Sequence, residues 1–297
     1  MVVAIRLRDA IELIVLGAVW GASFLFMRIA SPEFGPVVLV ELRVLIAALV
    51  LLPVLLVREN LVSLSQNWRN LVFLGVVNSA IPFYLFAYST LTLTAGYASI
   101  LNATAPMFTA TIAWLWLSQE LTSLQSTGLF IGIVGVTVLA WPNLSFEIDG
   151  AATAIAAGLL ASFCYGIAAN YTKKYVGNLS SLSVATGSML AATVFLLPGA
   201  VTYWPQQAIS TKAWLSVVAL GVASTGFAYI LYFRLIRHVG PAKAITVTYL
   251  IPAFAVFWGA IVLSEEITLI MIVGAAIIFT GTALATAIVS KRTIKDP

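Results

Sequence analysis

Residues 106–120 read PMFTATIAWLWLSQE, and residues 252–266 read PAFAVFWGAIVLSEE. Both stretches open with proline, continue through an apolar run and close on Ser-Gln-Glu or Ser-Glu-Glu. Pro252 stands 146 positions after Pro106, and an offset of 145–146 positions aligns much of the remaining chain with itself. Further matches are Trp20–Gly21 with Tyr165–Gly166, Arg28 with Lys173, Leu52–Pro53 with Leu197–Pro198, Leu74–Gly75 with Leu220–Gly221, Ala98 with Ala244, Thr122 with Thr268, Gly128 with Gly274 and Gly135 with Gly281. Prolines, glycines and a glutamate held in constant phase predict two related halves, repeat one at about 8–143 and repeat two at about 149–291.

The composition is that of a membrane protein. Of the 297 residues, 61% are hydrophobic and 9% are charged, with a mean hydropathy of +1.05. Soluble globular proteins are about 45–50% apolar and about 25% charged. The apolar character extends over the whole length, so the sequence predicts a single transmembrane domain over residues 1–297.

The apolar segments and their breaks predict an all-α membrane protein with ten transmembrane helices. A spanning helix needs about 20 mostly apolar residues. The segments lie at roughly 10–30, 36–57, 68–91, 95–118, 124–142, 150–173, 180–201, 212–235, 241–263 and 268–290. The break at 91–96 carries no charge, but its repeat equivalent, 237–242, reads Arg-His-Val-Gly-Pro-Ala and identifies it as a loop.

The two halves are expected to enter the membrane in opposite senses, because each contains an odd number of spans. If the N-terminus is cytoplasmic, the cytoplasmic segments hold all the lysines and arginines except Arg28, Lys212 and the intramembrane Arg43. Basic residues favour the cytoplasmic side. The sequence therefore predicts two inverted five-helix repeats around a central cavity, in the cytoplasmic (inner) membrane, with both termini cytoplasmic.

The residue inventory argues against an enzyme. No HExxH, GxSxG, CxxC or glycine-rich phosphate loop is present, and Cys164 is the single cysteine. The single histidine, His238, falls in a basic loop and is expected to be solvated. We therefore expect no metal site and no cofactor. The net charge of +4 reflects topology, so the expected partners are a small-molecule substrate and the lipid bilayer, and not nucleic acid.

Two prolines at corresponding depths mark the expected site. Pro106 and Pro252 each fall in the middle of a span, and interrupted helices at matching positions of two halves indicate a transporter's midplane site. The alternative is that both prolines only kink packed helices. The polar and aromatic residues expected to bind substrate are Trp20, Asn78, Ser79, Tyr84, Tyr88, Asn102, Tyr165, Thr248 and Tyr249. A packed or lipid-facing position is the alternative for Trp20 and Tyr165.

Glu41 and Arg43 are the charged residues inside a predicted span. Ionisable residues at membrane depth are functional candidates, here for a charged gate or for coupling. At a spacing of two residues they do not face each other on one helix. Arg43 lies close enough to the outer end to extend its side chain toward the interface, so a structural role is the alternative.

Small residues recur on the fifth and tenth spans. Gly128, Gly132 and Gly135 in one span, and Gly274 and Gly281 in the other, permit close helix approach. Packing within or between monomers accounts for them without a role in the site.

The stretch from Pro106 to Glu120, continued by Thr122, Gln125, Gly128 and Gly135, resembles the signature of the EamA-type branch of the drug/metabolite transporter superfamily. The second half repeats it, with Met271 in place of Gln125. The Trp20–Phe24 segment and the second span with Arg43 are similar to that family's first two helices. The resemblance implies a ten-helix carrier with a central cavity, and the overall likeness is to bacterial aromatic amino acid exporters.

Three substrate classes remain open from the sequence. A cavity of tryptophan, tyrosine and amide side chains suits amino acids or similar small neutral metabolites. A nucleotide-sugar or phosphorylated-sugar carrier needs several basic residues at depth. A multidrug exporter of organic cations is expected to use a buried carboxylate, which the middle of the first span lacks. The sequence gives no oligomeric partner.

Overall fold

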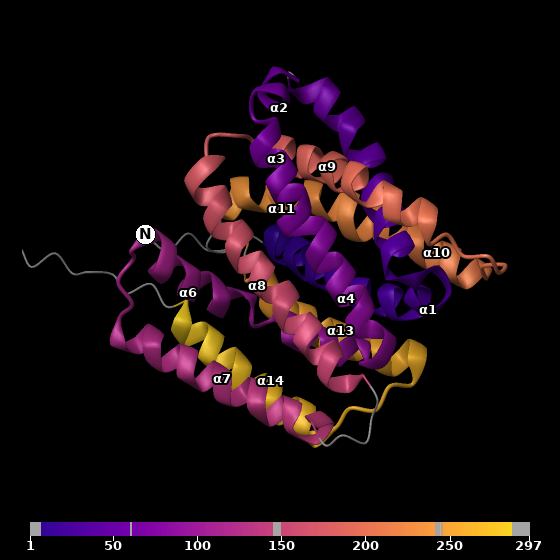
Figure 1. Cartoon of the computed structure of the whole chain (residues 1–297). Coiled ribbons are helices and arrows are strands. Elements are labelled where there is room, and N and C mark those ends of the chain that lie inside the picture. Colours follow the sequence, from indigo (N-terminus) through magenta and orange to yellow (C-terminus); the bar gives the residue numbers. More distant parts are fainter. Residues whose placement is uncertain (1–6, 60, 145–149, 241–243, 245, 287–297) are drawn as a thin grey trace, which may run out of the picture.

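The computed structural model describes residues 7–59, 61–144, 150–240, 244 and 246–286 (Figure 1). Within these ranges every regular element is a helix. The elements are α1 (Leu7–Arg58), α2 (Val62–Gln66), α3 (Trp68–Leu74), η1 (Gly75–Ala80), α4 (Ile81–Thr92), α5 (Ala95–Asn102), α6 (Ala105–Leu117), α7 (Ser123–Leu144), α8 (Ala151–Tyr175), α9 (Ser181–Thr202), α10 (Thr211–Ala219), η2 (Leu220–Phe227), α11 (Ala228–Val239), α13 (Val247–Leu263) and α14 (Leu269–Ala285). The predicted all-α membrane fold is confirmed at this level.

Helix lengths follow the apolar segments of the sequence. Seven helical segments within the described residues are long and apolar enough to cross a membrane, and α13 and α14 are shorter apolar helices. Element α1 combines two helices across a kink, where Gly35 adopts φ 71° and ψ 152°. Glycine accepts this conformation because it has no Cβ. The kink falls in the predicted break between the first two spans.

The halves share unusual backbone at matching positions. The π-helices η1 and η2 contain Gly75 and Gly221, which are repeat equivalents. Ser118 and Ser264 end α6 and α13 in the left-handed conformation, with φ of 51° and 55°. Left-handed serine is uncommon. Its occurrence at two positions 146 residues apart supports the relation between the halves.

The two expected helix interruptions differ. In the first half, α5 ends at Asn102 and α6 begins at Ala105, so Pro106 lies in the first turn of a new helix. Proline fits there because a first-turn N–H has no helical acceptor. In the second half, Pro252 lies inside α13, which continues from Val247 to Leu263. The expected interruption at Pro252 is therefore absent, because the remaining hydrogen bonds of α13 hold the helix continuous around the proline.

Helices α7 and α14 lie side by side, as Figure 1 shows. A Cβ atom added to Gly128 would collide with the backbone nitrogen of Ala285, and one added to Gly281 would collide with that of Gly132. A Cβ atom on Gly135 would lie 2.8 Å from the backbone nitrogen of Ile278. The glycines therefore permit backbone contact between these two helices within one chain.

Candidate functional site

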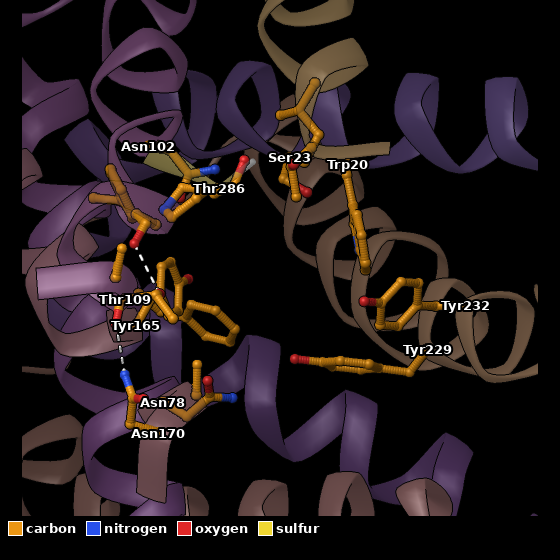
Figure 2. A pocket seen from close by; sticks show the side chains of 18 of the residues that line it. Trp20, Ser23, Asn78, Asn102, Thr109, Tyr165, Asn170, Tyr229, Tyr232 and Thr286 are labelled. Atoms are coloured by element: carbon orange, nitrogen blue, oxygen red, sulfur yellow. Dashed lines mark hydrogen bonds between the residues drawn. The ribbon is translucent and has the colours of Figure 1, made fainter. Parts of the chain in front are cut away.

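A cavity of about 630 Å³ lies among helices from both halves of the chain. Its lining comes from α1, η1, α4, α5, α6, α7, α8, η2, α11, α13 and α14. Cavities of about 300–1,000 Å³ are typical of small-molecule sites. Figure 2 shows side chains from several of these helices arranged around the open space. The first half and the second half thus contribute jointly to one site.

One wall of the cavity is aromatic. The Trp20 ring centroid lies 5.1 Å from that of Tyr232 and 6.4 Å from that of Tyr229. Across the cavity, the rings of Phe86 and Tyr165 stack at 6.1 Å. Tyr229 extends into the space seen in Figure 2, with its hydroxyl on the side of Asn78. These rings offer apolar surface with polar tips, which suits an amphipathic solute.

Amide side chains lie on the opposite wall. Asn170 Nδ2 donates to the carbonyl oxygens of Thr109 and Gly166, both at 2.9 Å. The bond to Thr109 is drawn in Figure 2 and ties α8 to α6 beside the cavity. Asn102, the last residue of α5, also lines the space. The broken helix therefore delivers an amide to the cavity at the point where α5 ends.

Arg43 lies inside the bundle and lines the cavity, with 6% of its surface exposed. Its Nε donates to Thr225 Oγ1 at 3.0 Å, its Nη1 lies 3.7 Å from the Met27 sulfur, and its guanidinium carbon lies 3.7 Å from the centre of the Phe83 ring. The expectation that Arg43 extends outward to the interface is thus wrong. The hydroxyl of Thr225 and the ring of Phe83 hold the side chain inward.

Glu41 lies in a different environment from Arg43. Its side chain is 3% exposed, and neither carboxylate oxygen has a hydrogen-bond partner among the described residues. It does not line the cavity, and no ion pair joins it to Arg43 in the described part of the chain. The two charged residues therefore point to different surroundings, which agrees with their spacing along the helix.

The structure brings about half of the sequence candidates together. The residues that line the cavity are Trp20, Arg43, Asn78, Asn102, Pro106, Tyr165 and Thr248. The residues that do not are Glu41, Ser79, Tyr84, Tyr88, Tyr249 and Pro252. Tyr88 and Tyr249 instead place their hydroxyls 3.5 Å from Thr153 Oγ1 and 3.3 Å from Thr286 Oγ1. Their roles in transport remain predictions.

The candidates also omitted several lining residues. These are Tyr229 and Tyr232 of α11, Asn170 and Lys173 of α8, Thr109 of α6, and Gln119 and Gln125 near the end of the cavity. Tyr229 and Asn170 are polar residues within predicted spans, and this was a signal by which the sequence could have identified them. The sequence did not show which side of each helix faces inward.

The cavity reaches one end of the bundle. Helix α8 runs parallel to α5 and α6, since Ser162 bonds the Leu101 carbonyl and Asn170 bonds that of Thr109. Lys173 therefore lies at the end where α6 finishes, which we call the Lys173 end. Gln119 and Thr286 join Lys173 in the lining there.

The opposite end is held together by Glu265. Both of its carboxylate oxygens accept from the Ala95 backbone N–H at 3.0 Å, at the N-terminus of α5. Arg28 Nε lies 3.8 Å from Glu265 Oε1, and Arg28 Nη1 donates to the carbonyls of Thr90 and Leu91 at 2.6 and 2.7 Å. None of these residues lines the cavity. This network joins both halves at the end of the bundle that the cavity does not reach, which we call the Glu265 end.

Other proteins are similar to this chain in sequence and in fold. A sequence profile of the EamA-like transporter family matches residues 10–141 and again residues 152–287. The "Uncharacterized transporter YoaV" of Bacillus subtilis is 22% identical over 282 residues, covering 93% of this chain and 96% of its own. The "Probable terminal-alkyne amino-acid exporter" of Streptantibioticus cattleyicolor is 24% identical, covering 97% and 96%. A solved protein structure matches with a TM-score of 0.66 at 17% identity, covering 94% of this chain and 97% of that one. The chain belongs to the EamA-like transporter family.

Proposed function

We propose that this protein is a secondary transporter of the cytoplasmic membrane that exports amino acids, including aromatic ones, or similar small neutral metabolites. The observation that carries the proposal is the cavity, which combines aromatic walls and amides and has no acidic side chain among the described residues that line it. Such a site suits a small amphipathic solute. Similarity to a relative named as an amino-acid exporter supports the same class.

Alternating access would use the repeat architecture. We infer ten spans in two inverted five-helix repeats, about 8–143 and 149–291, with both termini cytoplasmic. The kink in α1, the paired π-helices and the two matches of the family profile support the repeats. The bias of basic residues supports the orientation. With this orientation, the cavity opens toward the cytoplasm at the Lys173 end.

The lining disfavours the other two substrate classes. An organic-cation carrier needs a carboxylate to balance the charge, and the part of the lining that the structure describes contains none. A nucleotide-sugar or phosphorylated-sugar carrier needs clustered basic groups around each phosphate. Here Arg43 lies on α1 and Lys173 lies near the end of α8, and the described residues add no third lysine or arginine to the lining.

Counterflow in proteoliposomes tests the proposal. Vesicles loaded with one unlabelled candidate are mixed with its labelled form, and the panel holds amino acids, nucleotide sugars and organic cations. We expect transient accumulation with one or more amino acids. Accumulation only of a nucleotide sugar or an organic cation would overturn the substrate assignment, and failure of the whole panel would count against transport of these classes.

Replacing Trp20 with alanine tests the aromatic wall. We expect the apparent affinity for the transported amino acid to fall about tenfold, because an aromatic stacking partner contributes roughly 0.5–1.5 kcal/mol beyond its buried area. The matched control is Phe130→Ala on α7, since Phe130 is 68% exposed and lies outside the cavity. Equal kinetics in both variants would remove Trp20 from the site.

Replacing Glu41 with glutamine tests coupling to protons. Glu41 lies outside the cavity lining, so we expect wild-type flux to depend only weakly on a pH gradient and Glu41→Gln to behave alike. The measurement is uptake into proteoliposomes with and without an imposed gradient. Strongly gradient-driven flux in the wild type that disappears in the variant would show that Glu41 couples transport to protons.

A further inference from the structure

Arg43 is a buried cation without an anionic partner among the residues that the structure describes. Its described contacts are the neutral Thr225 hydroxyl, the Met27 sulfur and the Phe83 ring. These contacts use Nε and Nη1, and no described residue accepts a hydrogen bond from Nη2. A buried charge lacking a counter-charge is destabilising by several kcal/mol. The cavity therefore has an unsatisfied positive group at its wall.

The groups beside Arg43 form a set of hydrogen-bond donors. Tyr165 of α8 and Tyr229 of α11 line the same cavity as the Arg43 guanidinium. Asn78 of η1 also lines this cavity. Arginine, tyrosine hydroxyls and an amide are the donors that bind carboxylates, and arginine can donate two parallel bonds to one carboxylate.

We propose that Arg43, with Tyr165 and Tyr229, binds the carboxylate of the substrate, and that this group rather than an ammonium is the charge the cavity recognises. The inference rests on the proposed transport function and narrows its substrate class to molecules with one carboxylate and an apolar body. The rings of Trp20 and Tyr232 lie beside Tyr229 and receive the apolar body. Because no described residue of the lining is acidic, an ammonium group on the substrate adds little affinity.

Binding of four related molecules shows whether the cavity recognises the carboxylate or the ammonium group of the substrate. Isothermal titration calorimetry on the purified full-length protein is performed with phenylalanine, 3-phenylpropanoate, phenylalaninamide and phenethylamine. The first two carry the carboxylate, and the last two lack it. We expect the acids to bind about 10- to 100-fold more tightly than the amide and the amine, the range for a hydrogen bond to a charged group.

Variants at Arg43 separate binding from folding. The Arg43→Gln variant should bind the acids only as tightly as it binds the amide, and its affinity for the amide should equal that of the wild type. A purely structural role of Arg43 would not produce this selective loss. Arg43→Lys keeps the charge and should retain a several-fold preference for acids, because lysine lacks the planar fork. Arg69→Gln is the control, since Arg69 is exposed on α3 outside the cavity and should leave the preference intact.

The outcomes also separate this inference from the proposed function. Equal binding of acid and amine by the wild type, or no binding of any of the four, overturns the role of Arg43. Acid-selective binding without counterflow of any amino acid would leave the carboxylate site standing and overturn the proposed export of amino acids.

Discussion

Replacing Glu265 with glutamine is expected to open the end of the bundle that the cavity does not reach. The neutral amide loses the charge that attracts Arg28 and weakens the two bonds from the Ala95 N–H. Hydrogen bonds to a charged group contribute about 1.5–3 kcal/mol. If the two ends open alternately, that loss raises the population of the form open at the Glu265 end roughly 10- to 100-fold.

Cysteine labelling measures this population. Ser31 is 1% exposed and lies 3.5 Å from Thr90 Oγ1, next to the carbonyls that Arg28 holds. Ser31→Cys is introduced together with Cys164→Ser, and the rate of reaction with a polar maleimide is followed in detergent. Glu265→Gln should accelerate labelling by roughly tenfold or more. Glu266 follows Glu265 in the sequence and is exposed, so Glu266→Gln is the control. Equal rates in all three backgrounds would show that Glu265 does not hold this end closed.

The residues of the Glu265 network can be compared with the matching positions of the other repeat. The repeat equivalents of Arg28, Ala95 and Glu265 are Lys173, Pro241 and Gln119. Proline has no N–H, and glutamine has no charge. These positions keep a cation, Lys173, but have neither the carboxylate nor the backbone N–H of the Glu265 network, and Pro241 lies outside the described residues. This difference agrees with a cavity that reaches the Lys173 end.

Replacing Gly281 with alanine is expected to lower the stability of the protein strongly. The added methyl group would meet the backbone of Gly132, which cannot move without separating α7 from α14. Overpacking typically costs about 1–3 kcal/mol. A loss of about 3 kcal/mol corresponds to a decrease in Tm of roughly 6–12 °C. Thermal unfolding monitored by the loss of monodisperse protein in gel filtration gives the value.

Gly132→Ala is the matched control on the facing helix. Its added methyl group would meet the sulfur and terminal methyl of Met107, the far end of a flexible side chain. Met107 can move aside, so we expect a loss of about 1 kcal/mol or less. Gly128→Ala should behave like Gly281→Ala, because it meets the backbone of Ala285. Equal effects at Gly132 and Gly281 would contradict backbone contact as the cause.

The position of each apolar segment was predictable because it depends on local composition. The predicted spans 68–91, 95–118, 180–201 and 212–235 correspond to helical segments 68–92, 95–117, 181–202 and 211–239. The glycines of α7 and α14 were also recognised as packing residues, because small residues at helical spacing have few other uses in a membrane. The predicted ends beyond residue 286 lie outside the described residues.

The sequence by itself determined the membrane class and the family, and it predicts the internal repeat, since these follow from hydrophobic length and from residues held in phase. The tertiary structure decided which polar residues share a cavity. A membrane helix is apolar on most sides, so its own sequence does not fix which side faces inward; contacts with neighbouring helices do. Those contacts place Tyr229 in the cavity and Tyr84 outside it. They also hold Arg43 against Phe83, well away from the interface to which its long side chain could have extended.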